Sequence, residues 1–404
     1  MKLQEIVAEP QKSLYYMERF VNNGSISGFT WKNTTSKVTS PLSDNAFFYL
    51  YTCTFPIENM QVYGDFPHFF EEDENCILIH PDMASQDALL KYSPIKSKIK
   101  AMPTASARTV KLCDYSGYLK LNYWGIIGRI DRKLTKDHIL CSLGLNNILT
   151  NLLGTDESEF CNLSFLPESS AKSFLSSNLD FGVVYREELP CGKKAKNIKY
   201  LIPFFSLFSI DKNSPMDDLL LLQLINNSSE NPQDYVLDKI IFPIIANYFH
   251  LVLNVGLQPE WHSQNLLLGL NEHMDIVSFV MRDLESMDID ITMRKELGLS
   301  NKLECFPYKH IFNEQYNYQI KHSFMFDFKL GEYLLEPIIS VLCMRFEIDK
   351  NKIYNSVKKY TAKFVKQLPK AFFPEESWYA IKNEIINSDT IERPYVNMGM
   401  PKFR

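Results

Sequence analysis

Runs of β-branched and aromatic residues alternate with polar residues through the middle of the chain. These runs predict strands at residues 46–55, 76–81, 117–129, 179–189 and 199–208. Alternation within the third run places its side chains on two opposite faces of one strand, as in a half-buried sheet. The pattern therefore predicts a sheet-rich middle.

A helical spacing of apolar residues dominates the second half of the chain. Asn231 can cap a helix whose first residue is Pro232, and Gly256 can end that helix in a left-handed conformation. Between these signals we expect a long, mostly buried helix with a kink near Pro243.

The two patterns together predict an α+β protein. A β-rich central region, residues 76–215, would pack on a mostly helical C-terminal domain, residues 216–404. Residues 1–75 would form an N-terminal segment of their own. The total of 404 residues is long enough for about two to three domains.

One stretch inside the helical half breaks its pattern: "PEWHSQNLLLGLNEHMDIVSFVMRDLE", residues 259–285. Two apolar runs flank the short polar loop "NEHMD", which predicts an embedded β-hairpin. The start of the first hairpin strand lies beside the end of the second, so Asn265 and Asp283 should be neighbours. Four more polar side chains would gather at the same end: Glu260, His262, Gln264 and Arg282.

This polar hairpin end has two interpretations. Oxygen atoms of Glu260, Asn265 and Asp283 are ligands suited to Mg²⁺, which usually keeps waters and bridges to substrate phosphates. His262 and Arg282 would then meet negative charge on a nucleotide or a substrate. In the alternative, the same groups satisfy their own hydrogen bonds and only close the hairpin. The convergence of six polar residues favours a functional site.

A second polar cluster lies in the β-rich region, within "PTASARTVKLCDYSGYLKL". Thr104, Ser106 and Thr109 offer hydroxyl groups near Arg108, and Lys120 projects from one face of a strand. Cations and hydroxyls on a β-scaffold suit a triphosphate, although no Walker-type glycine-rich loop is present. The alternative is an ordinary half-exposed strand whose polar side chains face water, and spacing alone leaves both open.

Composition narrows the class of protein further. A formal charge of −5 argues against a general nucleic-acid binder. The eight cysteines include no C-x-x-C pair, which is typical of reduced thiols. No apolar run reaches the ~18 residues of a membrane span, and Glu5 and Glu9 stand where a secretory signal has its apolar core. We therefore expect a cytoplasmic protein without a membrane span.

Taken together, the two clusters resemble the motifs of the IucA/IucC family, the NRPS-independent siderophore synthetases. The matching residues occur in the family's order: His80-Pro81; Thr104, Ser106, Arg108 and Thr109; Lys120-Leu121 with Arg132; Arg186-Glu187; Glu260, His262, Gln264 and Asn265; and Arg282-Asp283. The Glu-x-His-x-Gln-Asn and Arg-Asp pair is fairly specific, whereas the His-Pro element alone is weak.

The resemblance implies a cupped-hand architecture, in which ATP and Mg²⁺ lie between β-rich "fingers" and a helical "palm". It also implies a reaction: a carboxylate, typically citrate or a citryl derivative, forms an acyl-adenylate, and an amine or alcohol then displaces AMP. The implied partners are these small molecules, and a homodimer stays open.

The resemblance also implies roles for individual residues. Nucleotide binding would fall to Thr104, Ser106, Arg108, Thr109, Lys120, Gln264 and Arg282. The metal would be held by Glu260, Asn265 and Asp283. The catalytic contacts, with the carboxylate substrate and the phosphates, would come from His262, Arg132 and Lys120.

Three departures from the family pattern bear on these expectations. Only 79 residues precede His80, so we expect a shortened N-terminal region, which leaves the acceptor substrate open. Asp82-Met83 replace the usual residues after the His-Pro element, which favours a structural role for His80. Ser286 stands where a glycine commonly follows the Arg-Asp pair, and the turn there should differ.

Two other classes of protein stay in view. A His, an Asn and then an Asp after a hairpin are also typical of kinase-like phosphotransferases, but Ser263 occupies the position of their catalytic Asp. A nucleotide-binding relative without turnover is the non-enzymatic alternative.

Overall fold

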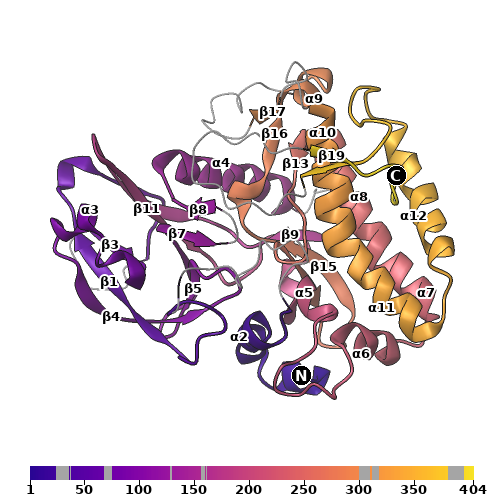
Figure 1. The fold of residues 1–404 in the computed structure, drawn as a ribbon, viewed down its shortest axis with the longest axis horizontal. Helices are drawn as coiled ribbons and strands as arrows, with labels where there is room; N and C mark the ends of the chain where they lie inside the picture. Colours follow the sequence, from indigo (N-terminus) through magenta and orange to yellow (C-terminus); the bar gives the residue numbers. More distant parts are fainter. Residues whose placement is uncertain are drawn as a thin grey trace.

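A large antiparallel sheet and a mostly helical half lie side by side in the molecule (Figure 1). The computed structural model describes residues 1–23, 36, 38–67, 75–127, 130–155, 160, 162–299, 310–311, 318–380 and 395–404. Helices account for 40% and strands for 24% of the structure, so the predicted α+β class is confirmed.

Within these ranges the large sheet has eight strands, and each neighbouring pair is antiparallel. In spatial order they are β2 (Met60–Tyr63), β10 (Ser170–Ser176), β11 (Leu179–Arg186), β6 (Tyr118–Leu121), β5 (Thr109–Leu112), β4 (Ile95–Pro103), β1 (Phe48–Thr54) and β3 (Cys76–Ile79). The strands predicted at residues 46–55, 76–81 and 179–189 are confirmed.

Two of the predicted strands are shorter than expected. The run 117–129 contains β6 and then β7 (Tyr123–Ile127), which leaves the large sheet to pair with β8 (Ile130–Arg132). The run 199–208 becomes helical after four residues, because Pro203 ends β12 (Tyr200–Pro203) and precedes the helical turn α5 (Phe204–Leu207).

Helix α4 (Lys136–Leu153) packs across one face of the large sheet (Figure 1). Thr135 caps its first turn by accepting a hydrogen bond from the backbone N–H of His138. Gly182 of β11 allows the helix to approach closely, since a Cβ at that position would overlap Ile139. The helix therefore covers the face of the sheet from which Lys120 projects.

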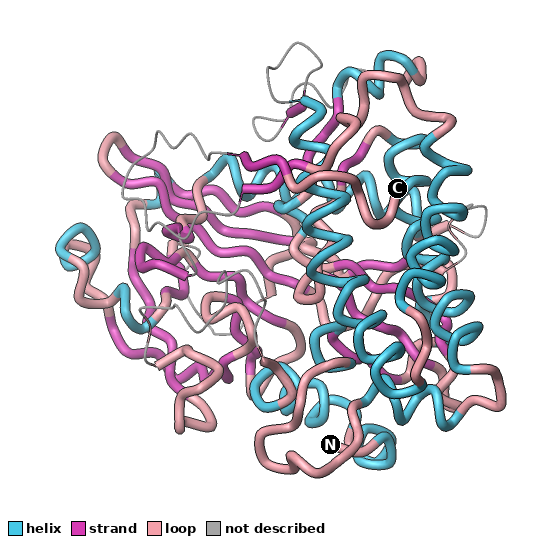
Figure 2. Tube along the Cα trace, turned by 45° about the vertical axis from the view of Figure 1, so that its right-hand side comes forward, coloured by secondary structure: helices cyan, strands magenta, loops and turns pink. Residues whose placement is uncertain are grey.

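The helical half is built around a second, four-stranded sheet with the order β12-β14-β15-β9. The predicted hairpin is confirmed as β14 (Leu266–Leu270) and β15 (Ile276–Met281), and β15 also pairs in parallel with β9 (Leu163–Phe165). Helices gather with this sheet in one half of the molecule (Figure 2), and the larger ones share its apolar core: α6 (Leu220–Asn227), α8 (Phe242–Val255), α11 (Glu336–Phe346) and α12 (Lys350–Val365), with π-helices at Tyr235–Ile241 and Phe324–Leu335. The shorter elements are α3 (Asp87–Leu90), α7 (Pro232–Asp234), α9 (Ile291–Glu296), α10 (Tyr318–Ser323), β13 (Leu257–Gln258), β16 (Asp288–Asp290), β17 (His310–Ile311), β18 (Trp378–Ala380) and β19 (Tyr395–Asn397).

The long helix predicted after Asn231 is confirmed at both ends. The Asn231 side chain accepts hydrogen bonds from the backbone of the first turn, and Gly256 ends the helix with φ of 65°. The hydrogen-bond pattern changes from π to α at Phe242, directly before Pro243. This 24-residue segment is long and apolar enough to cross a membrane, but 61% of its most apolar window is buried inside the protein, as in a core helix.

Two helices near the N-terminus were not predicted from the pattern. They are α1 (Leu3–Ala8) and α2 (Pro10–Phe20). Helix α2 packs against β12, and Leu14 joins a small apolar cluster with residues of the second sheet. Strands β1 and β2 also precede residue 75 and lie in the large sheet; the predicted division of the chain at residues 75 and 215 stays a prediction.

Candidate functional site

Lys120 is buried on one face of strand β6. Its neighbours Leu119 and Leu121 point the other way, into the apolar core of the large sheet. The Lys120 side chain is 1% exposed, so the interpretation of this strand as a half-exposed one with polar groups in water is wrong. A buried ammonium needs charged partners, and the hairpin provides them.

The open end of the β14–β15 hairpin brings the expected polar residues together. The backbone N–H of Arg282 donates to the carbonyl of Asn265 at 3.0 Å, so Asn265 and Asp283 lie close, as predicted. The Asn265 side-chain amide lies 3.4 Å from both the Glu260 carbonyl and Ser286 Oγ. Ser286 Oγ in turn donates to the carbonyl of Asp283 at 2.7 Å. A serine side chain therefore holds the turn at the position where the family pattern has glycine.

The strand cluster and the hairpin cluster meet at Lys120. Its Nζ lies 2.5 Å from Asp283 Oδ1, although 163 positions separate the two residues along the chain. Arg186 Nη2 approaches the same carboxylate oxygen at 3.5 Å. Burial by itself would raise the pKa of Asp283, but Lys120 and Arg186 hold that pKa well below its usual value. Asp283 is therefore ionised at neutral pH.

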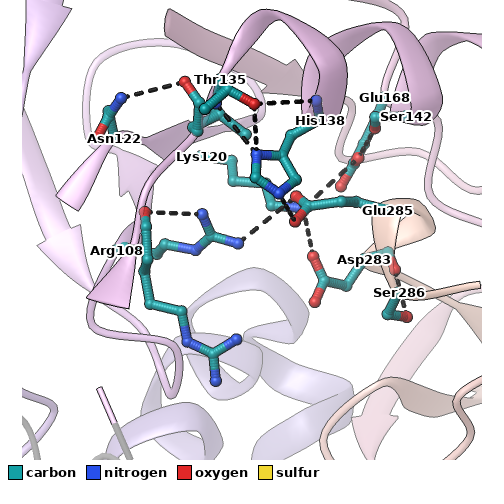
Figure 3. Close-up of polar contacts among 12 residues, drawn as sticks. Arg108, Lys120, Asn122, Thr135, His138, Ser142, Glu168, Asp283, Glu285 and Ser286 are labelled. Carbon is teal, nitrogen blue, oxygen red and sulfur yellow. Dashed lines mark hydrogen bonds and ion pairs between the residues drawn. The ribbon is translucent and has the colours of Figure 1, made fainter. Parts of the chain in front are cut away.

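Glu285 occupies the space between three basic side chains (Figure 3). Its carboxylate lies 2.8 Å from Lys120 Nζ, 3.6 Å from Arg108 Nη2 and 4.0 Å from His138 Nε2. Burial favours the neutral acid, but Lys120 and Arg108 outweigh it and lower the pKa of Glu285 to about 2. Glu285 thus neutralises Lys120 and Arg108, two of the cations that were predicted to bind phosphate.

Glu168 contacts the same cluster through Arg186 and Lys120. It is fully buried, accepts a hydrogen bond from Ser142 of α4, and accepts two from Arg186 at 3.0 and 2.5 Å. Its second oxygen lies 3.9 Å from Lys120 Nζ. Glu168 therefore fixes Arg186 and Lys120 relative to α4.

One pocket joins the two clusters. Its lining consists of Thr104, Ser106, Thr109, Tyr118, Leu166, Arg186, Gln264, Asn265, Arg282 and Asp283. Its volume is about 30 Å³, which is room for water but not for a nucleotide. Ligand pockets are typically about 300–1,000 Å³, so a nucleotide would have to move the side chains that line it.

The segment between Pro103 and β5 forms one wall of this pocket. Thr104 Oγ1 donates to the carbonyl of Thr109 at 2.6 Å and accepts from the backbone N–H of Ser106 at 3.2 Å. Ala107 adopts φ of 58°, a conformation that costs a non-glycine residue about 1–2 kcal/mol. His80 is fully buried behind this turn, with Nε2 3.3 Å from the Ala107 carbonyl. The structural role expected for His80 is confirmed.

Arg132 lies next to Arg108, which donates to the Arg132 carbonyl at 3.2 Å. Burial and the neighbouring Arg108 charge both lower the pKa of Arg132. No carboxylate among the described side chains forms an ion pair with the Arg132 guanidinium, in contrast to the other cations of the site. The Arg108 charge thus acts on the Arg132 guanidinium through space, and an anion close to both would relieve this repulsion.

Arg282 forms contacts with both the hairpin and helix α2. Its Nε donates to the carbonyl of Gln264 at 2.7 Å, and its Nη1 lies 2.5 Å from Glu18 Oε1 on α2. Arg282 also lines the pocket. Its predicted role in nucleotide binding stays a prediction.

His262 is neutral at physiological pH. Burial and the nearby Lys329 lower its pKa to about 4. Its Nδ1 accepts a hydrogen bond from the backbone N–H of Gln264 at 3.2 Å, which leaves the proton on Nε2. His262 can therefore donate a hydrogen bond to an oxyanion, but it brings no positive charge.

The predicted metal ligands divide into two groups. Asn265 and Asp283 line the pocket, whereas the Glu260 carboxylate pairs with Lys329 at 2.6 Å and is not part of the lining. Within the described part of the chain, no group of three or more His, Cys, Asp or Glu side chains is arranged to hold a metal ion. Mg²⁺ commonly binds through one or two carboxylates together with waters and phosphates, so the donors in the pocket fit it.

Sequence reasoning missed three carboxylates of this site. Glu285 follows Asp283 by two residues and belonged to the quoted hairpin segment, so its position was a usable signal. Glu168 and Glu18 belong to no recognised motif, and the sequence gives no sign of their burial. Arg186 was part of the family pattern but received no role.

Solved structures of siderophore synthetases share this fold. The petrobactin biosynthesis protein AsbB from Bacillus anthracis str. Sterne aligns with a TM-score of 0.66 at 14% identity, over 88% of this chain and 68% of that one. ATP-bound aerobactin synthetase IucA from a hypervirulent pathotype of Klebsiella pneumoniae gives 0.64 at 12% identity, over 88% and 70%. Aerobactin synthetase IucC from the same source gives 0.64 at 15% identity, over 87% and 69%.

At these identities the likeness concerns the fold. No protein-family model matches the chain, and no curated protein matches its sequence. The fold is therefore that of siderophore synthetases, and the activity has to be argued from the site.

Proposed function

We propose that this protein is an ATP-dependent synthetase that adenylates a carboxylate, citrate or a related acid, and condenses it with an amine or alcohol in siderophore biosynthesis. The observation that carries the proposal is the contact between Lys120 and Asp283. It joins the hydroxyl-rich strand cluster to the hairpin in one pocket, as the motif resemblance requires. The shared fold and the ATP-bound neighbour support ATP as the co-substrate.

In the first step a substrate carboxylate oxygen attacks the α-phosphorus of ATP, and the bond to pyrophosphate breaks. Arg132 and Arg108 lie close enough for the Arg108 charge to lower the pKa of Arg132, and both are suited to stabilise the negative charge that develops there. His262, with its proton on Nε2, would donate a hydrogen bond to the same charge. Thr104, Ser106 and Thr109 would contribute hydroxyl contacts to the phosphates.

In the second step the amine or alcohol attacks the acyl carbon, the bond to AMP breaks, and the nucleophile loses a proton. AMP is a good leaving group, so no nucleophilic side chain of the protein is needed. This chemistry requires positioning and fixed charges rather than a covalent enzyme intermediate.

Mg²⁺ would neutralise phosphate charge during the first step. Asn265 and Asp283 would hold it, and Glu260, the third residue of the predicted metal set, would join them after release from Lys329. Lys120, Arg108, Arg186 and Arg282 already face carboxylates, so these cations are largely neutralised within the protein. Mg²⁺ would then supply positive charge that a polyphosphate needs and that these side chains do not provide.

The test is product analysis with ATP and Mg²⁺ across citrate, 2-oxoglutarate and succinate, each with and without a diamine. We expect pyrophosphate and AMP to form with at least one acid. Formation of ADP would instead support a kinase-like phosphotransfer, although Ser263, at the position of the kinase Asp, is 4% exposed and carries no carboxylate. Nucleotide binding without any turnover would identify a non-catalytic relative. The cytoplasmic location and the homodimer stay predictions.

A further inference from the structure

Glu18, in the last turn of helix α2, is a carboxylate that holds both halves of the pocket. Its side chain is 2% exposed. One oxygen accepts a hydrogen bond from the backbone N–H of Ala105 at 2.9 Å, and the other lies 2.5 Å from Arg282 Nη1. Three segments that are distant along the chain therefore meet at one carboxylate.

Both groups that Glu18 holds belong to pocket walls. Ala105 lies between Thr104 and Ser106, which line the pocket on the strand side. Arg282 directly precedes Asp283 and also donates to the Gln264 carbonyl at 2.7 Å. Glu18 thus fixes the distance between the hydroxyl-bearing wall and the hairpin wall.

Helix α2 contacts both the second sheet and the large sheet beside the pocket. Leu14 packs with Leu166, Leu267 and Val280 at the second sheet. On the other side, the ring of Tyr15 makes an edge contact with Tyr118 of β6, with centroids 6.4 Å apart. Figure 1 shows α2 between the large sheet and the helical half. An apolar anchor beside a buried carboxylate gives the helix a defined position at the pocket.

A buried carboxylate is costly to retain unless its oxygens are fully bonded. Apolar packing of Leu14 also holds α2 against the second sheet. The carboxylate adds directional contacts, because it accepts hydrogen bonds from the Ala105 amide and from the Arg282 guanidinium. Such a group suits a site whose two walls have to be set within a fraction of an ångström.

We propose that Glu18 is a positioning residue of the nucleotide pocket and that α2 is a structural part of the active site. Glu18 acts through Arg282 and the Ala105 amide, and it does not touch the substrate. This inference rests on the proposed function for its kinetic consequence, but the clamp itself is a property of the fold.

The experiment compares Glu18→Gln with Glu9→Gln. Glu9 lies at the start of the same helix, and its carboxylate is 59% exposed and pairs only with Lys12 among the described contacts. Steady-state pyrophosphate release is measured against ATP concentration, and amide hydrogen exchange is followed at residues 104–109 and 282–286. Glu18→Gln should raise KM for ATP about tenfold or more with a smaller change in kcat, and exchange should become faster in both segments. Glu9→Gln should behave as the wild type.

The possible outcomes separate the two proposals. Unchanged exchange at both segments in folded Glu18→Gln would overturn the clamp, whatever the activity. Faster exchange in that variant, with no pyrophosphate released by the wild type, would reject the proposed function and the kinetic role but leave the clamp in place. If Glu18→Gln does not fold, Glu18→Asp, which keeps the charge on a shorter side chain, should fold and show the same KM change in weaker form; an unchanged KM there would reject the positioning role.

Discussion

Replacing Asp283 by asparagine tests the contact on which the site depends. The substitution keeps the shape of the side chain and removes its charge. It also preserves the backbone, because Asp283 adopts φ of 67° and ψ of 63°, and asparagine tolerates this left-handed conformation as well as aspartate does. Alanine would add backbone strain at the same position and would confuse the two effects.

The expected loss of stability follows from the partners that remain. Breaking a buried ion pair costs about 3–5 kcal/mol when the remaining charge has no partner. Lys120 would keep Glu285 at 2.8 Å, and the Asp283 side chain is 33% exposed. We therefore expect the free energy of unfolding to fall by only about 1–2 kcal/mol, which urea denaturation can measure.

The expected loss of activity is larger. Asp283 is ionised at neutral pH because Lys120 and Arg186 hold its pKa well below the usual value, so the variant lacks a charge that the wild type always carries. Pyrophosphate release should fall about a hundredfold or more. Glu272→Gln is the matched control, since this carboxylate lies in the loop at the other end of the hairpin and is 60% exposed. A folded Asp283→Asn variant with near-normal turnover would refute the assignment of Asp283 to the reacting centre.

Three further predictions concern the same region. Glu285→Gln removes a carboxylate that competes with phosphate for Lys120 and Arg108, so calorimetry should show several-fold tighter binding of tripolyphosphate without Mg²⁺, on the order of 1 kcal/mol; weaker binding would contradict the competition. Chelation of divalent cations should abolish pyrophosphate release, and addition of Mg²⁺ should restore it. Turnover in excess EDTA would exclude a Mg²⁺ requirement. Burial lowers the pKa of His80 to about 4 from its ordinary value of 6.5, so the unfolded chain takes up the proton first as pH falls. The stability that neutral His80 contributes is complete above pH 6.5 and is lost toward pH 4, by about 2 kcal/mol between pH 7 and 5. Urea titrations at both pH values should show a shallower loss in His80→Asn than in the wild type, and equal losses would contradict this account.

Local features of this protein could be predicted from its sequence. Asn231 and Gly256 mark the ends of the long helix because capping and left-handed termination involve only the nearest backbone groups. The hairpin was predictable for the same reason, since two apolar strands and a short polar loop determine their own pairing. That pairing alone placed Asn265 beside Asp283.

The partners of the buried charges depended on the tertiary structure. The sequence offered a water-facing strand and a phosphate site as equal interpretations of Lys120, and only its burial against Asp283 and Glu285 excluded the water-facing strand. Glu18 and Glu168 gave no signal at all, because a carboxylate has the same local preferences whether it lies in water or in a pocket. Helix periodicity and turn chemistry act over a few residues, whereas the burial and pairing of a charge are set by segments that meet only when the whole chain has folded.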